Sequence, residues 1–185
     1  MTTIHGLCWR LACAAVLLTS GVNAADQGAA PPEDRFAAVR TLIGTWEGTT
    51  EGQPRVGRVT RQYAAVLRDQ FIEVRSTSTY APQAANPKGE IHEEIGFISF
   101  DRGQKRLRLR QFHVEGFVIQ YVQEERLETR ALSFTSDTIE NGPAGWRARE
   151  TYVLHGRDEF EEVFELARDG RPFEVYSRSR LKRVK

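Results

Sequence analysis

The feature that most constrains the fold is a succession of ten β-like segments separated only by short turns. The segments are Thr45–Thr50, Val56–Leu67, Gln70–Tyr80, His92–Phe100, Lys105–His113, Phe117–Glu124, Ala131–Asp137, Gly145–Leu154, Glu159–Arg168 and Pro172–Val184. Asn-Pro, Gly-Pro and Asp-Gly pairs, which are typical of turns, lie between several of them. No long crossover interrupts the series. The sequence therefore predicts an all-β, ten-stranded, up-and-down antiparallel barrel rather than a sandwich.

A short amphipathic helix is predicted before the first strand. Phe36, Val39 and Ile43 recur at spacings of three and four residues, which places them on one helical face. The helix leads into Gly44-Thr45-Trp46-Glu47-Gly48, where a large aromatic side chain stands among small residues. We expect Trp46 to close one end of a barrel whose interior can hold a ligand.

The first 24 residues have the composition of a signal peptide. Arg10 precedes the apolar run 11–19, and Val22-Asn23-Ala24 offers small residues at the positions that a signal peptidase recognises. We expect cleavage after Ala24, export to the periplasm or out of the cell, and a flexible leader over 25–32. Residues 33–185 then form a single domain. The apolar run is too short to span a bilayer, so no membrane insertion is expected.

Removal of this segment excludes several kinds of chemistry from the mature chain. Cys8 and Cys13 are the only cysteines, so disulfides, thiolate metal sites and cysteine nucleophiles are not expected. The net charge falls from +1 to zero with the loss of Arg10, which argues against nucleic acid as a partner. Phosphate-loop, His-x-x-x-His and Gly-x-Ser-x-Gly motifs are missing. Because three histidines remain, a three-ligand zinc site needs almost all of them to converge, and we do not expect one.

Three of the segments carry charged and aromatic side chains on the same face. These faces are Phe71/Glu73/Arg75/Thr77, Trp146/Glu150/Tyr152/Leu154 and Phe160/Glu162/Phe164/Leu166. If they point inward, the barrel interior is wet or holds a polar ligand. If they point outward, the aromatic residues belong to the surface. The alternation by itself leaves both possibilities open.

Two histidines are candidates for chemistry. His92 and Glu94 are two residues apart in a strand, so their side chains share one face. A neighbouring carboxylate raises the basicity of an imidazole, which suits an acid–base pair in a small enzyme. A polar pair at the barrel rim explains the pattern as well. His113 follows Leu107 and Leu109 on one face. It is therefore either a residue that lines the cavity or a core histidine whose ring nitrogens are hydrogen-bonded.

The last strand offers a different kind of site. Tyr176 and Arg178 share a predicted face, and a phenol with a guanidinium can hold a carboxylate such as the headgroup of a fatty acid. A solvated charged face is the alternative explanation of Arg178. No nucleophile or substrate is indicated, so no catalytic residue is assigned.

Three stretches of the chain resemble the nitrobindin-like heme-binding β-barrels of the calycin superfamily. They are Leu-Ile-Gly-Thr-Trp-Glu-Gly at 42–48, His-Glu-Glu-Ile-Gly-Phe at 92–97 and Leu-Lys-Arg-Val at 181–184. The first stretch is also compatible with lipocalins and fatty-acid-binding proteins, so the second is the more specific. Together they extend the resemblance over about 36–184.

The resemblance implies a ten-stranded barrel that holds heme b through a proximal histidine, binds nitric oxide and isomerises peroxynitrite. The matching position, five residues before Leu181, is Tyr176. Because tyrosine ligates heme iron in catalase, Tyr176 or His113 is the candidate iron ligand. The candidates for ligand binding are thus Trp46, His92, Glu94, His113, Tyr176 and Arg178.

These observations predict an exported barrel for a small, mostly apolar ligand, with heme as the first candidate. A carrier of fatty acids or other hydrophobic carboxylates is the main alternative, and a small enzyme using His92 and Glu94 is the third. The oligomeric state is not predicted.

Overall fold

The computed structural model describes residues 34–53, 55–84, 86–125 and 130–184. The predicted signal peptide (1–24) and leader (25–32) lie outside these residues. Within the described part of the chain, no helix is both long enough and apolar enough to cross a membrane.

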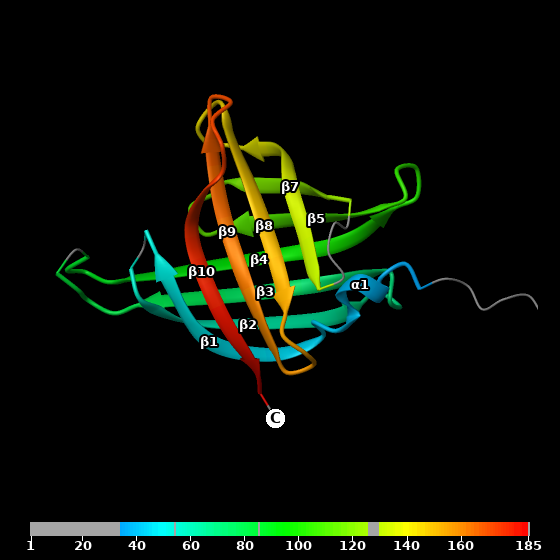
Figure 1. Ribbon diagram of the computed structural model, residues 1–185, viewed down its shortest axis with the longest axis horizontal. Coiled ribbons are helices and arrows are strands. Elements are labelled where there is room, and N and C mark those ends of the chain that lie inside the picture. Colours follow the sequence, from blue (N-terminus) through cyan, green and yellow to red (C-terminus); the bar gives the residue numbers. More distant parts are fainter. Residues whose placement is uncertain (1–33, 54, 85, 126–129, 185) are drawn as a thin grey trace, which may run out of the picture. The chain divides into compact units, whose positions relative to one another are not determined.

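The described residues form one helix followed by ten strands. They are α1 (Ala37–Arg40), β1 (Gly44–Gly52), β2 (Gly57–Val66), β3 (Phe71–Tyr80), β4 (Glu90–Asp101), β5 (Arg106–His113), β6 (Val118–Gln123), β7 (Ala131–Glu140), β8 (Trp146–Leu154), β9 (Glu159–Arg168) and β10 (Glu174–Arg183). Consecutive strands pair antiparallel, and β10 pairs with β1 to close the barrel (Figure 1). The predicted all-β, ten-stranded barrel is confirmed.

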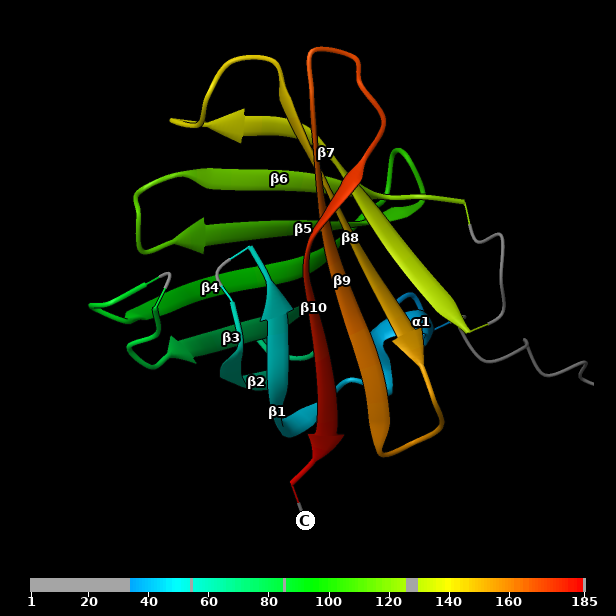
Figure 2. The same ribbon diagram turned by 60° about the vertical axis from the view of Figure 1, so that its left-hand side comes forward.

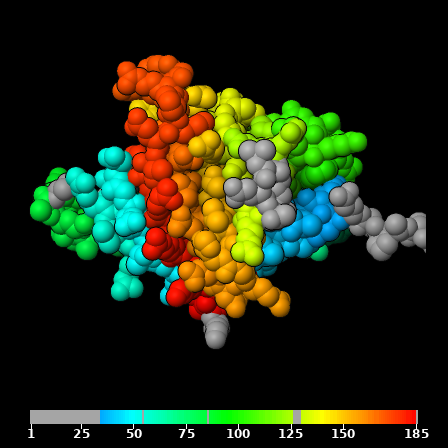
Figure 3. Space-filling view, in the orientation of Figure 1, coloured from blue at the N-terminus to red at the C-terminus, as the bar shows by residue number. Residues whose placement is uncertain are grey.

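The first and last strands meet at a close seam. Figure 3 shows β10 lying between β1 and β9 on one face of the molecule. Gly48 of β1 is opposite Leu181 of β10. A Cβ atom at Gly48 would lie 1.8 Å from the carbonyl oxygen of Arg180, so only glycine permits this approach of the two backbones.

The helix α1 lies at one end of the barrel (Figure 2), and Trp46 belongs to the same core as its Val39. α1 is shorter than the helix that the sequence predicted. Of the predicted apolar positions Phe36, Val39 and Ile43, only Val39 lies within it. Trp46 is 1% exposed, and its Nε1–H donates to the Leu42 carbonyl oxygen at 2.7 Å. Its ring meets Phe160 edge-on, with 4.7 Å between ring centres. Trp46 therefore closes this end, as its sequence context indicates.

The strand register decides which of the three mixed faces point inward. β8 and β9 turn theirs inward, so Glu150 and Glu162 are buried. β3 does the opposite, because its buried residues include Ile72 and Val74 and the face of Phe71 points outward. Two strands thus bring carboxylates into the interior of the barrel.

Candidate functional site

A cavity of about 430 Å³ opens at the end of the barrel where β1 ends and β4 begins. Its apolar lining residues come from β6 to β9 and the adjoining turns: Phe117, Ile119, Ile139, Pro143, Trp146, Phe164 and Leu166. Most of its polar lining residues come from the other strands, and Glu150 and Glu162 add carboxylates from β8 and β9. The cavity size is in the range of sites for small organic ligands.

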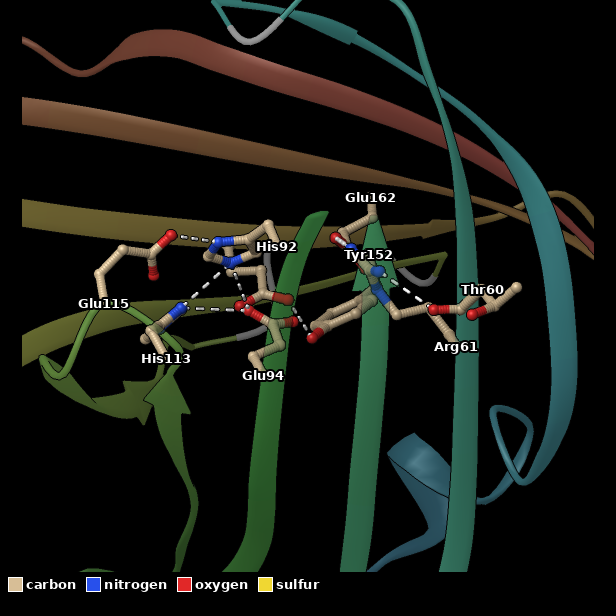
Figure 4. A network of polar contacts seen from close by, with 9 residues as sticks. Thr60, Arg61, His92, Glu94, His113, Glu115, Tyr152 and Glu162 are labelled. Carbon is tan, nitrogen blue, oxygen red and sulfur yellow. Dashed lines mark hydrogen bonds and ion pairs between the residues drawn. The ribbon is translucent and has the colours of Figure 1, made fainter. Parts of the chain in front are cut away.

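His92, Glu94 and His113 gather on one wall of this cavity. The pairing of β4 with β5 sets Glu94 directly opposite His113, and His92 lies two residues earlier on the same face of β4. His92 Nε2 is 3.7 Å and His113 Nδ1 is 3.4 Å from Glu94 Oε2. His92 Nδ1–H donates to Glu115 Oε1 at 2.7 Å, and Figure 4 shows these four side chains converging.

The two imidazoles differ in basicity, because carboxylates dominate the surroundings of His92 and burial dominates those of His113. The nearby carboxylates of Glu94 and Glu115, working against burial, raise the pKa of His92 to about 9. Burial lowers the pKa of His113, whose Nε2 has no hydrogen-bond partner among the described residues. Burial opposes ionisation of Glu94, but His92, Arg61 and His113 outweigh it and lower its pKa to about 2. At neutral pH, His92 and Glu94 form an ion pair.

A second polar group lies next to the first. Arg61 donates two hydrogen bonds to Glu162, at 2.8 and 3.1 Å, and both side chains are buried (Figure 4). Burial opposes the charge of Arg61, yet Glu162 outweighs it and keeps the guanidinium pKa above its usual value. The two form a fork-shaped pair whose charges cancel.

Among the described residues, no arginine or lysine forms an ion pair with Glu150. Burial, reinforced by Glu162 and Glu94, holds the pKa of Glu150 well above its usual value, which favours the neutral acid in the folded protein. The Tyr152 hydroxyl donates to Glu150 Oε1. A neutral carboxylic acid in a cavity can itself donate a hydrogen bond, as in ketosteroid isomerase.

The predicted pairing of Tyr176 with Arg178 is wrong. The β9–β10 register shifts between Val175 and Ser177, so Tyr176 and Ser177 both line the cavity. Arg178 lies on the outside, where it forms an ion pair with Glu161 at 2.8 Å. The irregularity reverses the alternation that the sequence suggested.

Tyr176 stands in acidic surroundings. Its ring meets Phe164 edge-on, with 5.7 Å between ring centres. Burial, with smaller contributions from Glu90, Tyr80 and Glu115, raises the pKa of its hydroxyl. The phenol therefore stays protonated at neutral pH.

Of the residues singled out in the sequence, His92, Glu94, His113 and Tyr176 line the cavity, whereas Trp46 and Arg178 do not. The other charged lining residues were not candidates: Arg61, Glu90, Glu115, Glu150 and Glu162. The mixed faces of β8 and β9 were a signal for the last two. Glu115 is two residues beyond His113 in a turn, and nothing in the local pattern marks it.

Comparison with known proteins supports a family assignment. A family model described as "THAP4-like, heme-binding beta-barrel domain" matches residues 35–183. A comparison with curated proteins gave no match.

Among solved structures, Rv2717c from M. tuberculosis is 18% identical, with 83% of this chain and 99% of that chain covered and a TM-score of 0.62. A de novo designed fluorescence-activating β-barrel is 16% identical (80% and 97% covered, TM-score 0.39). A redesigned β-barrel is 11% identical (78% and 93% covered, TM-score 0.42). The likeness to Rv2717c shows a shared fold. With the family match over almost the whole barrel, the chain belongs to the family of THAP4-like heme-binding β-barrel domains.

Proposed function

We propose that this barrel binds a small ligand with a flat apolar body and a neutral or positively charged polar group. The observation that carries the proposal is the division of the cavity into an apolar wall and a carboxylate-rich wall. Aromatic rings such as Trp146 and Phe164 offer contact area for the apolar body. The neutral acid of Glu150 and the ionised Glu94 offer a hydrogen-bond donor and an acceptor.

The charge of the cavity argues against a fatty-acid carrier. The carboxylate side chains that line it are Glu90, Glu94, Glu115, Glu150 and Glu162. Among the described lining residues Arg61 is the only arginine or lysine, and Glu162 already binds it through both oxygens. The other cation among the described lining residues, His92, is flanked by Glu94 and Glu115. A ligand carboxylate would therefore meet negative charge, with both cations already paired.

The ligand proposal is tested with two fluorescent probes that share one aromatic body, one carrying a quaternary ammonium and the other a carboxylate. We expect the cationic probe to bind at least about tenfold more tightly, a difference of about 1.4 kcal/mol. Ile139→Trp, which fills the apolar wall, should abolish this binding. Ile95→Trp is the matched control on the outer surface, where Ile95 is exposed. Equal binding of both probes, or binding unchanged in Ile139→Trp, would refute the proposal.

Heme is the second candidate, because the family model names it and Tyr176 lines the cavity. The side chains do not fit an axial ligand, however. Tyrosine binds ferric iron as a phenolate, and the surroundings of Tyr176 favour its protonated form. The Nδ1 atom of His113 faces Glu94 and His92, and its Nε2 atom is buried.

We therefore expect that added hemin gives no Soret band that depends on Tyr176 or His113. The absorption spectrum is recorded with the wild-type protein, with Tyr176→Phe and with His113→Ala. A stoichiometric Soret band that shifts in either variant would show that the chain holds heme through that residue.

We also propose that the protein is exported, on the signal-peptide pattern of residues 1–24. The test is to express the full chain in a Gram-negative bacterium and to measure the intact mass of the protein from the periplasmic fraction. The expected mass is that of a chain that begins at Ala25. Full-length protein confined to the cytoplasm would refute export.

A further inference from the structure

Three potential ligand atoms on the cavity wall surround a single point. His92 Nε2 and His113 Nδ1 are 3.4 Å apart, and they lie 3.7 and 3.4 Å from Glu94 Oε2. The circle through these atoms has a radius of about 2.0 Å, which matches Zn–N and Zn–O bond lengths. With such bonds, neighbouring ligand atoms of a tetrahedral site are about 3.4 Å apart.

We propose that His92, Glu94 and His113 bind one divalent transition-metal ion, with zinc favoured by their spacing. Two imidazoles and a carboxylate form a donor set found in metal sites that keep a coordination position open. Because all three side chains line the cavity, the open position faces the space in which we place the organic ligand. The metal site does not depend on that ligand.

Glu115 provides an outer carboxylate for this site. It accepts a hydrogen bond from His92 Nδ1–H at 2.7 Å, so Nε2, on the side of Glu94, is the nitrogen left to lose its proton and bind the ion (Figure 4). A carboxylate–histidine–metal arrangement fixes the tautomer and the orientation of the ring. The His113 ring is held by stacking on Phe117, with 4.2 Å between ring centres.

A competing group of ligands lies nearer the surface. Glu90, His92 and Glu115 also bring ligand atoms together, but Glu90 and Glu115 are exposed. Within this group, His92 Nδ1–H already donates to Glu115. His113 belongs only to the first group, so its substitution distinguishes the two.

The proposal is tested on the untagged protein after removal of metal with a chelator. We expect calorimetry to give one Zn²⁺ per chain, with proton release as His92 loses its proton. Co²⁺ is expected to give the intense visible absorption of a four-coordinate site, and Zn²⁺ should displace it.

His92→Ala, His113→Ala and Glu94→Gln should each abolish stoichiometric binding of Zn²⁺. Glu115→Gln should weaken binding by about 10- to 100-fold, as expected for an outer carboxylate. His155→Ala is the matched control, because His155 is exposed in the turn after β8, and it should bind like the wild-type protein.

Circular dichroism shows which variants are folded. For any variant that is not, the Co²⁺ spectrum of the wild-type protein keeps the proposal testable. Binding that persists in His113→Ala would assign the ion to the Glu90 group and overturn the proposal. Weak six-coordinate Co²⁺ absorption, or no stoichiometric binding by the wild-type protein, would overturn it as well.

Discussion

Among single residues, Glu150 shows how a barrel interior changes the chemistry of a side chain that is ordinary in the sequence. Its strand position predicts only that it shares a face with Trp146 and Tyr152. In the folded protein it is buried, and its neighbours include the carboxylates of Glu94 and Glu162. The pKa is raised because the charged form would lose hydration and meet like charges.

The raised pKa makes stability depend on pH. Above pH 4.5, the usual pKa of a glutamate, the unfolded chain releases the Glu150 proton more readily than the folded protein does. Folding then becomes less favourable as pH rises, by up to about 1.4 kcal/mol per pH unit. Glu150→Gln keeps an acceptor for Tyr152 and has no proton to retain. Between pH 4.5 and 8, we expect the free energy of unfolding of this variant to rise relative to that of the wild-type protein.

This comparison is made by urea unfolding at a series of pH values. Taking the difference between the two proteins removes the contributions of the groups they share. Parallel curves over the whole range would show that Glu150 is ionised in the folded state.

At the scale of secondary-structure elements, the seam between β1 and β10 determines whether the sheet closes. Gly48 is required there because a Cβ atom would meet backbone atoms of β10, which cannot move without breaking the pairing. Gly48→Ala is expected to lower the free energy of unfolding by at least about 2 kcal/mol, as overpacking does in a tight site.

Gly103→Ala is the matched control, because its nearest contact would be the Asp101 side chain at 3.3 Å. We expect it to change stability by less than about 1 kcal/mol. Urea unfolding measures both effects, and equal values for the two variants would contradict the role assigned to the seam.

β10 also shows a limit of reasoning from alternation. The run from Glu174 to Arg183 was recognisable as a strand, and its bounds were close to those predicted. The irregularity between Val175 and Ser177 could not be recognised from the sequence. It depends on the pairing with β9, and it brings Tyr176 to the cavity while Arg178 stays outside.

For the whole molecule, closure gives each of the ten described strands a hydrogen-bonded neighbour on both sides. Every pairing that closes the barrel lies within residues 44–183. Removal of 174–185 would uncover edges on both β1 and β9, which are templates for association with other chains. We expect the shortened protein to aggregate or to lack a cooperative unfolding transition.

Size-exclusion chromatography and thermal unfolding monitored by circular dichroism test this expectation. A protein that begins at Asp34 is the control, because it retains all ten strands, and it should unfold cooperatively as a soluble species. A soluble, cooperatively folded protein without β10 would show that closure is dispensable.

The sequence by itself determined the class and order of the elements: ten strands with local alternation and turns, and Trp46 at the closed end. These features depend on residues that are near one another in the chain. Only the tertiary structure decided which faces point inward, because a shift of one residue exchanges the two faces of a strand. It also brought His92, Glu94 and His113 together, whereas a three-ligand zinc site was not expected from the sequence. The register of β4 and β5 joins them, and that register is set by packing around the closed barrel.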